Sequence, residues 1–394
     1  MRAAMHENEP LESDAGGQEP VFAGDTLVHV VRQYKPSIGG LEDFVASLAA
    51  RQQGRFKRIR IVTCDEVFRG AGGKLPAHEV IDGIEIERLP YFGSPRYPMS
   101  PRILSAIRDA DLVHVHAVDF FFDALAFAAP FHGKPMVATT HGGFFHSQDY
   151  RLLKQIWFRT VTRLTANRYS AVACCSQSDY EKFSEIAPSK VRLIENGVDL
   201  GKFGDCGSRV PRRSLVTIGR LAINKRVDLL LDAMADLNAR DDNWTLDIIG
   251  TPFDWSAEDV TRMIAARGLT EKVHLHIGPS DAQIRDILAR NSLFVSASAY
   301  EGFGIALIEA MSAGLMPVVQ RNAAFSAFAA RHEGISLCDF TDPPTTARLI
   351  EKAHAALVKA PAAVRAQVMA VADTYSWAGT AQRYEDLYRD VTGR

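Results

Sequence analysis

The sharpest local pattern is the run from Glu301 to Glu309, which lies between a predicted strand and a predicted helix. Gly302 and Gly304 let the backbone approach a ligand closely, and the start of a helix favours a phosphate group. A carboxylate would repel that phosphate, so we expect Glu301 and Glu309 to accept hydrogen bonds from hydroxyl groups instead. A sugar nucleotide carries such hydroxyls on its hexose and its ribose. The alternative is a glycine turn with two solvated glutamates.

A second pattern, residues 219–225, also follows a predicted strand and precedes a predicted helix. The planar guanidinium of Arg220 suits two parallel hydrogen bonds to a phosphate, whereas Lys225 would act as a point charge. Together they could neutralise a diphosphate leaving group. A basic helix start on the surface is the alternative.

The first half of the chain carries three further candidates after predicted strands. Gly39 and Gly40 follow the first strand, where doubly wound sheets bind ligands, although no G-x-G-x-x-G pattern is present there. His141 could stabilise a sugar or a reacting oxygen. Ser176 would cap the next helix together with Asp179. For the two glycines the alternative is a tight turn, and for His141 it is a structural histidine. For Ser176 the helix cap is itself the reading that the local sequence favours.

The elements that must position these residues alternate between strands and helices. The predicted strands are 27–31, 59–62, 84–89, 112–116, 135–140, 171–175 and 191–194, and then 214–219, 246–250, 273–277, 293–296 and 316–319. The predicted helices include 42–50, 152–169, 227–237 and 377–392. This order is typical of βαβ units in parallel sheets. It predicts an α/β protein with two doubly wound, Rossmann-like domains.

The predicted domain limits follow from the same pattern. Residues 1–23 are polar and acidic and are expected to be a disordered tail. We expect a first domain over 24–208, a second over 209–375, and a C-terminal helix over 376–394 that could pack back on the first domain.

Composition narrows the class of protein. The chain has 394 residues, 47% of them hydrophobic, and a formal net charge of -2, so a global cationic field for nucleic acid is not expected. The five cysteines are odd in number and form no C-x-x-C pair, which argues against a disulfide scaffold and a zinc ribbon. No stretch reaches the ~20 apolar residues of a membrane span.

One segment nevertheless suggests contact with a membrane surface. Residues 151–168 mix five cations with Trp157 and Phe158, which suits anionic lipid headgroups if the segment is helical. We therefore expect a cytoplasmic protein held peripherally on the inner face of the cell membrane. A solvated arginine face above a core stripe is the alternative.

Taken in order, these patterns resemble the retaining glycosyltransferases of the GT-B fold, a family that includes sucrose synthases and bacterial mannosyltransferases. The resemblance runs from about Thr26 to the C-terminus. It is carried by Gly39-Gly40-Leu-Glu42, Val113-His-Val-His116, His141-Gly142, Glu195-Asn-Gly-Val-Asp199, Gly219-Arg220 with Lys225, and Glu301 and Glu309 spaced as E-x7-E. The overall length and the positions of His141, Ser176, Lys225 and Glu301 most closely resemble the α-mannosyltransferases of xanthan and acetan assembly. Those enzymes move mannose from GDP-mannose onto cellobiosyl-diphosphopolyprenol.

The resemblance implies two domains that face each other across a cleft, the second binding the nucleotide sugar and the first the acceptor. It implies that His141, Glu301 and Lys225 are catalytic. Donor binding would fall to Arg220, Lys225, Glu301, Gly302, Phe303, Gly304, Glu309 and Gly40, with Ser176 and Gly39 as further candidates. In this scheme Arg220 and Lys225 hold the diphosphate, Glu309 the ribose and Glu301 the hexose, and His141 lies near the transferred sugar.

The implied reaction retains the anomeric configuration by front-face displacement, without a protein nucleophile. The family generally works without a metal, so no cofactor is expected. The implied partners are GDP-mannose, a polyprenyl-diphosphate-linked oligosaccharide of exopolysaccharide assembly and an anionic membrane, without nucleic acid. Two alternatives stay open: a hexosyltransferase that uses UDP-glucose or another donor, and a catalytically silent module that binds a glycan or a nucleotide.

Overall fold

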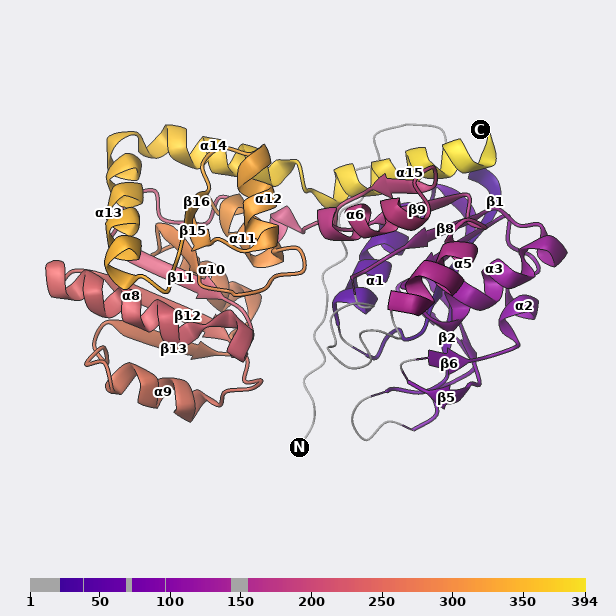
Figure 1. The fold of residues 1–394 in the computed structure, drawn as a ribbon, viewed down its shortest axis with the longest axis horizontal. Helices are drawn as coiled ribbons and strands as arrows, with labels where there is room; N and C mark the ends of the chain where they lie inside the picture. The colour runs from indigo at the N-terminus through magenta and orange to yellow at the C-terminus, as the bar shows by residue number, and fades with distance from the viewer. Residues whose placement is uncertain (1–21, 38, 69–72, 96, 143–154) are drawn as a thin grey trace.

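The computed structural model describes residues 22–37, 39–68, 73–95, 97–142 and 155–394, and they form two sheet-based domains (Figure 1). The first sheet has the strand order β10-β9-β8-β7-β1-β2-β4-β3. Its strands are β1 (Phe22–Val31), β2 (Phe56–Cys64), β3 (His78–Ile81), β4 (Ile84–Leu89), β7 (Leu112–His116), β8 (Met136–Thr139), β9 (Ala171–Cys174) and β10 (Val191–Leu193). Among the described residues of this sheet, only the pairing of β3 with β4 is antiparallel, and the other neighbouring strands are parallel.

Helices cover both faces of this sheet because its central strand is apolar on both sides. Val28 and Val30 of β1 face one core, whereas Leu27 and Val31 face the other, as the two-residue period of a strand requires. The helical elements are α1 (Gly40–Gln52), α2 (Ile103–Ala106), α3 (Phe120–His132), the π-helical turn η1 (Phe158–Thr162), α5 (Arg163–Ala166) and α6 (Gln177–Ile186). A small hairpin of β5 (Phe92–Ser94) and β6 (Tyr97–Met99) lies outside the sheet.

The second sheet is wholly parallel in the described residues, with the order β13-β12-β11-β14-β15-β16. Its strands are β11 (Ser214–Ile218), β12 (Thr245–Gly250), β13 (Val273–Ile277), β14 (Leu293–Ser296), β15 (Met316–Gln320) and β16 (Ser336–Cys338). The surrounding helices are α7 (Leu200–Phe203), η2 (Ile223–Lys225), α8 (Val227–Arg240), α9 (Ala257–Ala265), α10 (Asp281–Leu288), α11 (Ile305–Ser312), α12 (Ala323–Arg331), α13 (Pro343–Lys359) and α14 (Pro361–Asp373). Leu215 and Val216 of β11 face opposite cores, so this sheet is also buried on both sides.

The chain passes between the domains twice, and the two passing segments pair with each other. The backbone N–H of Val198 donates to the carbonyl of Tyr375 at 2.8 Å, and that of Trp377 donates to the carbonyl of Val198 at 3.3 Å. After this crossing, α15 (Trp377–Thr392) lies along the first domain, as its yellow ribbon shows in Figure 1. Tyr384 and Tyr388 of α15 are fully buried there.

Two predicted limits differ from the structure. Phe22 begins β1 inside the segment expected to be a tail, because its ring stacks on Phe56 with centroids 4.7 Å apart. Val198 and Phe203 already pack in the core of the second domain, about ten residues before the predicted boundary. The rest of the predicted tail lies outside the described residues.

Among the described residues, no single helix is both long and apolar enough to cross a membrane. Helices α13 and α14 reach the required length and apolarity only together, and they are bent by 110° relative to each other.

Candidate functional site

Two loops at the carboxyl ends of β11 and β14 bring Lys225 and Glu301 together. These strands are neighbours in the second sheet, so the loops that follow them meet at one edge. The ammonium group of Lys225 donates to a carboxylate oxygen of Glu301 at 2.6 Å. The side-chain amide of Asn224 also donates to the carbonyl of Tyr300 at 3.2 Å. The sequence predicted these two charges as separate ligand contacts, and the structure shows them as an ion pair.

Glycines in the two loops leave room for neighbouring side chains. A Cβ on Gly219 would lie 3.3 Å from Cε of Lys225, so a larger residue would press on the lysine side chain. Gly304 precedes α11 with a φ of 99°, in the left-handed region that favours glycine. A Cβ there would also lie 3.1 Å from the ring of Phe325. Gly302 is exposed, whereas the side chain of Phe303 is buried below the loop.

Arg220 lies on the same loop as Lys225, but its side chain contacts an aromatic ring and not Glu301. Its guanidinium carbon is 4.3 Å from the centroid of the Phe253 ring, a cation–π contact. Within the described parts of the chain it forms no ion pair. Its charge therefore stays available to an anion, unlike that of Lys225.

Glu309 lies further along α11, next to a lysine that sequence reasoning missed. Burial raises the pKa of Glu309, the ammonium group of Lys202 opposes this shift, and the carboxylates of Asp281 and Asp199 add to it. Nζ of Lys202 is 4.0 Å from Oε1 of Glu309. Lys202 belongs to a four-residue helix, α7, and no sequence pattern singled it out.

The strand ends of the first domain hold His141 and Ser176, and α6, which begins after Ser176, packs against α12 of the second domain. Thr140, which precedes His141, donates to Asp179 at 2.5 Å, and Ser176 accepts the backbone N–H of Asp179 at 3.2 Å. Ser176 is therefore the cap of α6, which is the reading that its local sequence favours. Burial raises the pKa of Tyr300, and the carboxylates of Asp179 and Glu301 both add to that shift. A carboxylate of the first domain therefore acts on a side chain of the second-domain loop that carries Glu301.

Gly39 and Gly40 lie at the start of α1. A Cβ on Gly39 would lie 2.6 Å from a carboxylate oxygen of Glu42, whereas the space around Gly40 is open. An exposed helix start with an open glycine leaves room for a ligand, so a role of Gly40 in donor binding stays a prediction.

Arg32 and Asp119 form a second electrostatic feature that the sequence analysis missed. Burial raises the pKa of Asp119 to about 7, and the guanidinium of Arg32 opposes this shift. Burial lowers the pKa of His141 to about 3, and here the charge of Arg32 acts in the same direction. One carboxylate oxygen of Asp119 accepts the backbone N–H of Phe121 at 3.0 Å and so caps α3. The other is buried without a hydrogen bond from the described residues.

Three buried histidines have the spacing of a metal site, since the nearest nitrogens of His29, His114 and His116 lie within 4.8 Å of one another. Their ring nitrogens are all hydrogen-bonded to Gln52, Tyr388, Thr139, His141 or each other. Burial lowers the pKa of His29 to about 4, so its ring is neutral near pH 7. A satisfied hydrogen-bond network therefore accounts for the cluster without a metal ion.

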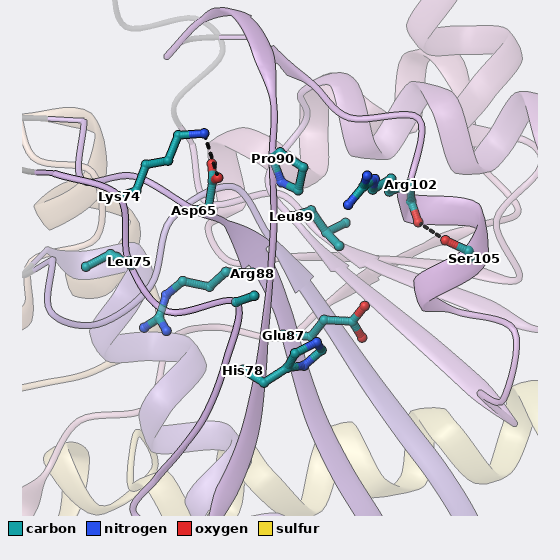
Figure 2. Close-up of a pocket in the computed structure, with 11 residues that line it drawn as sticks. Asp65, Lys74, Leu75, His78, Glu87, Arg88, Leu89, Pro90, Arg102 and Ser105 are labelled. Carbon is teal, nitrogen blue, oxygen red and sulfur yellow. Dashed lines mark hydrogen bonds and ion pairs between the residues drawn. The ribbon is translucent and has the colours of Figure 1, made fainter.

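The pocket in Figure 2 has a volume of about 610 Å³ and lies at the edge of the first sheet, beside β3 and β4. Much of its charged lining is already paired, with Lys74 at 3.7 Å from Asp65 and Glu87 at 3.0 Å from Arg60. The guanidinium of Arg88 donates to the carbonyl of Lys35 at 2.7 Å. The predicted site residues do not line this pocket, so it is separate from the candidate site.

Comparison with known proteins identifies both domains. Residues 38–202 match the family model described as Glycosyltransferase Family 4, and residues 205–356 match Glycosyl transferases group 1. Among solved structures, the HepE protein of Anabaena bound to UDP and glucose has a TM-score of 0.67 at 18% identity, covering 93% of this chain and 100% of that one. A sucrose-phosphate synthase of Thermosynechococcus elongatus has a TM-score of 0.70 at 16% identity, covering 94% and 99%. At these identities the likeness shows the fold alone, which is GT-B.

The relatives in sequence are closer. A protein of Komagataeibacter xylinus named GDP-mannose:cellobiosyl-diphosphopolyprenol alpha-mannosyltransferase is 40% identical over 369 residues, which cover 93% of this chain and 94% of the relative. A protein of the same name from Xanthomonas campestris is also 40% identical, over 93% of this chain and 97% of its own length. The chain therefore belongs to the family of glycosyltransferases that these α-mannosyltransferases represent.

Proposed function

We propose that the protein transfers mannose from GDP-mannose to a polyprenyl-diphosphate-linked cellobiosyl unit, with retention at the anomeric carbon. The observation that carries the proposal is the 40% identity over nearly the whole chain to three enzymes with that name. The bond between C1 of mannose and the diphosphate breaks, and a new bond forms from C1 to an acceptor hydroxyl oxygen. The proton of that hydroxyl passes to the departing diphosphate, so GDP is the second product.

The residues supply position and charge in this reaction. Lys225 and Arg220 stabilise the charge that grows on the leaving diphosphate, as fixed cations do in low-dielectric sites. When the donor binds, Glu301 accepts hydrogen bonds from hydroxyls of the hexose in place of part of its contact with the lysine. Glu309 accepts a hydrogen bond from a hydroxyl of the ribose. His141 lies on the acceptor-binding domain, facing the transferred sugar. Holding the acceptor hydroxyl on the same face of C1 as the departing diphosphate accounts for much of the rate enhancement.

A panel of labelled nucleotide sugars tests the donor. The full chain is incubated with cellobiosyl-diphosphopolyprenol and GDP-mannose, GDP-glucose, UDP-glucose or UDP-galactose, and the lipid-linked product is separated. We expect a trisaccharide from GDP-mannose that an α-mannosidase shortens. A product from UDP-glucose alone would establish the alternative donor, and donor binding without any transfer would establish a silent module.

We further propose that the reaction needs no metal ion, because Arg220, a helix start and, once the diphosphate has displaced Glu301, Lys225 would face the leaving group. Turnover should then persist in EDTA. Complete loss on chelation, restored by Mg²⁺ or Mn²⁺, would assign the leaving-group charge to a metal instead.

We infer that the first domain docks on an anionic membrane, because a polyprenyl acceptor stays in the bilayer. Helices α3 and α5 lie side by side, joined by a 3.0 Å hydrogen bond from Thr165 to Asp123. Large apolar side chains are exposed on and beside these helices, namely Phe127, Phe131, Ile156, Trp157 and Leu164. Arg159 and Arg163, on η1 and α5, are also exposed, and we call this set the apolar–basic surface. Arg151 and Lys154 of the predicted segment lie outside the described residues.

A further inference from the structure

A chain of hydrogen bonds runs from the interior of the first domain to His141. Oε1 of Gln52 lies 2.9 Å from Nε2 of His29, and Nδ1 of His29 lies 2.9 Å from Nε2 of His116. Nδ1 of His116 then lies 3.2 Å from Nε2 of His141. Gln52, His29 and His116 are buried.

The direction of donation along this chain follows from its inner end. Nε2 of Gln52 donates to the hydroxyl of Tyr388 at 3.1 Å, which leaves Oε1 of Gln52 as an acceptor facing His29. A neutral imidazole has one N–H and one lone pair. Burial keeps the pKa of His29, His116 and His141 low, so all three rings are neutral near pH 7.

The tautomer of each ring therefore determines the tautomer of the next. His29 donates from Nε2 to Gln52, so its Nδ1 must accept from Nε2 of His116. His116 then has its lone pair on Nδ1, so it must accept from Nε2 of His141. The same logic leaves the lone pair of His141 on Nδ1, where no hydrogen bond from the described part of the chain reaches it.

We propose that His29 and His116 are positioning residues that hold His141 as the tautomer with its proton on Nε2 and its lone pair on Nδ1. His141 then accepts a hydrogen bond from a sugar hydroxyl and cannot protonate the leaving group. The ring of Phe44 supports this orientation, because its centroid lies 4.6 Å from that of His141 in an edge-on contact. The catalytic meaning of this tautomer rests on the proposed function, but the tautomer itself does not.

The C-terminal helix holds a neighbouring histidine that does not lead to His141. Tyr388 of α15 accepts from Gln52 and lies 2.7 Å from Nδ1 of His114, to which it donates. The other ring nitrogen of His114, Nε2, forms a hydrogen bond of 2.7 Å with the hydroxyl of Thr139. His114 therefore belongs to the histidine cluster but not to the chain of hydrogen bonds that ends at His141. His114 is therefore a matched control: it is as buried as His116, and its ring centroid is 4.1 Å from that of His116.

Nuclear magnetic resonance reads the tautomer without any activity. The full chain is labelled with ¹⁵N-histidine, and long-range ¹H–¹⁵N correlations are recorded at pH 7; the signals of His141 are those lost in His141→Gln. We expect the pattern of a neutral ring protonated on Nε2, and a mixture of tautomers in His116→Leu. A wild-type ring protonated on Nδ1, or a pattern unchanged in His116→Leu, would overturn the proposal.

Kinetics separate positioning from packing. We expect His116→Leu to lower kcat by about 10- to 100-fold, in the range found when a group that orients a functional histidine is removed, with KM for GDP-mannose within about twofold. His116→Asn keeps an acceptor near the former Nδ1 and should restore most of kcat. His114→Leu should retain kcat although it removes a ring of equal burial. Equal losses in His116→Leu and His114→Leu, or no rescue by asparagine, would show that the ring only packs.

The two hypotheses fail separately. A wild-type chain that transfers no sugar from GDP-mannose would refute the proposed function, while the resonance pattern would still decide the tautomer.

Discussion

Lys225 and Glu301 neutralise each other across 2.6 Å, so a bound diphosphate must compete with a carboxylate for the lysine. We expect Lys225→Ala to lower kcat/KM by about 10²- to 10³-fold, the usual loss when one charge-stabilising donor is removed from a site. The free energy of unfolding should change by only about 1 kcal/mol, because a partly exposed ion pair contributes little. Steady-state transfer assays and urea unfolding measure the two effects.

Arg226→Ala is the matched control for this variant. Arg226 is the adjacent cation but pairs with Asp228 at 2.7 Å and not with Glu301. Its loss should leave kcat/KM within about threefold of wild type. Near-wild-type turnover in folded Lys225→Ala would remove the lysine from the leaving-group role.

Asp119 should make stability depend on pH in an unusual direction. Its pKa of about 7 in the folded protein is above the value near 4 of an unfolded chain, so the folded state binds more protons between these values. Its contribution is therefore most favourable below pH ~4 and is lost as the pH rises through about 7. The free energy of unfolding of wild type, relative to that of Asp119→Asn, should fall from pH 5 to 7 and then stay constant. The whole loss amounts to about 1.4 kcal/mol for each pKa unit of the shift.

Urea unfolding of both proteins at several pH values measures this slope. Asp342→Asn is the control, because Asp342 also caps a helix, α13, but is exposed and has a lowered pKa. Its difference from wild type should be flat over the same range. A flat difference for Asp119→Asn as well would mean that Asp119 is not protonated in the folded state.

At the level of elements, the crossing between the domains is packed more tightly than its sequence suggests. A Cβ on Gly197 would lie 2.5 Å from Cδ2 of Trp377, the first residue of α15. We expect Gly197→Ala to cost about 1–3 kcal/mol, as overpacking does. Gly24→Ala, in β1, has open space around the new atom and should be nearly neutral. A fully stable Gly197→Ala would show that the tryptophan can move aside, and thermal unfolding distinguishes the cases.

Several parallel strands could be predicted from sequence because apolar residues occupy at least every second position in them. β7, β13 and β14 begin and end at the predicted residues. The edge strand β3 and the hairpin strand β5 were missed because they expose their side chains, so the hydrophobic pattern is absent there. Of the predicted helix 152–169, the described part contains a π-helical turn, which the helical period alone does not reveal.

The site shows a similar limit. The sequence singled out Lys225 and Glu301 by their place after strands, but their contact depends on β11 lying beside β14. The chain of hydrogen-bonded histidines could not be predicted from sequence, because it depends on the register of β1 and β7. In that register His29 pairs with His114, and Val31 with His116, across about 85 intervening residues. A histidine inside an apolar strand carries no local sign of its partner.

At the scale of the whole molecule, the apolar–basic surface predicts salt-sensitive binding to anionic vesicles. Each cation near such a surface contributes about 1 kcal/mol, and the attraction weakens as salt shortens the Debye length. We expect Arg159→Glu/Arg163→Glu to abolish most sedimentation with vesicles of anionic lipid at low salt. Phe131→Ser, which removes a side chain that is 91% exposed, should weaken binding further without affecting stability.

The control for this experiment reverses two charges on the second domain, away from the apolar–basic surface. Arg348 and Lys352 are exposed on α13 of the second domain, so Arg348→Glu/Lys352→Glu changes the net charge equally. It should sediment like wild type. Equal loss in both double variants would mean that net charge, and not this surface, governs binding.

The position of α15 has a consequence for how the protein is made. A ribosome completes the strands of the first domain long before it reaches Trp377, yet Trp377, Tyr384, Leu387 and Tyr388 fill one face of that domain's core. Arg394, just after α15, also pairs with Asp25 of β1. A nascent chain arrested before α15 should therefore expose apolar surface to chaperones and be cut rapidly by protease. Protection should arrive only once α15 has been made, and by then the second domain, whose residues precede α15 in the chain, has already been able to fold.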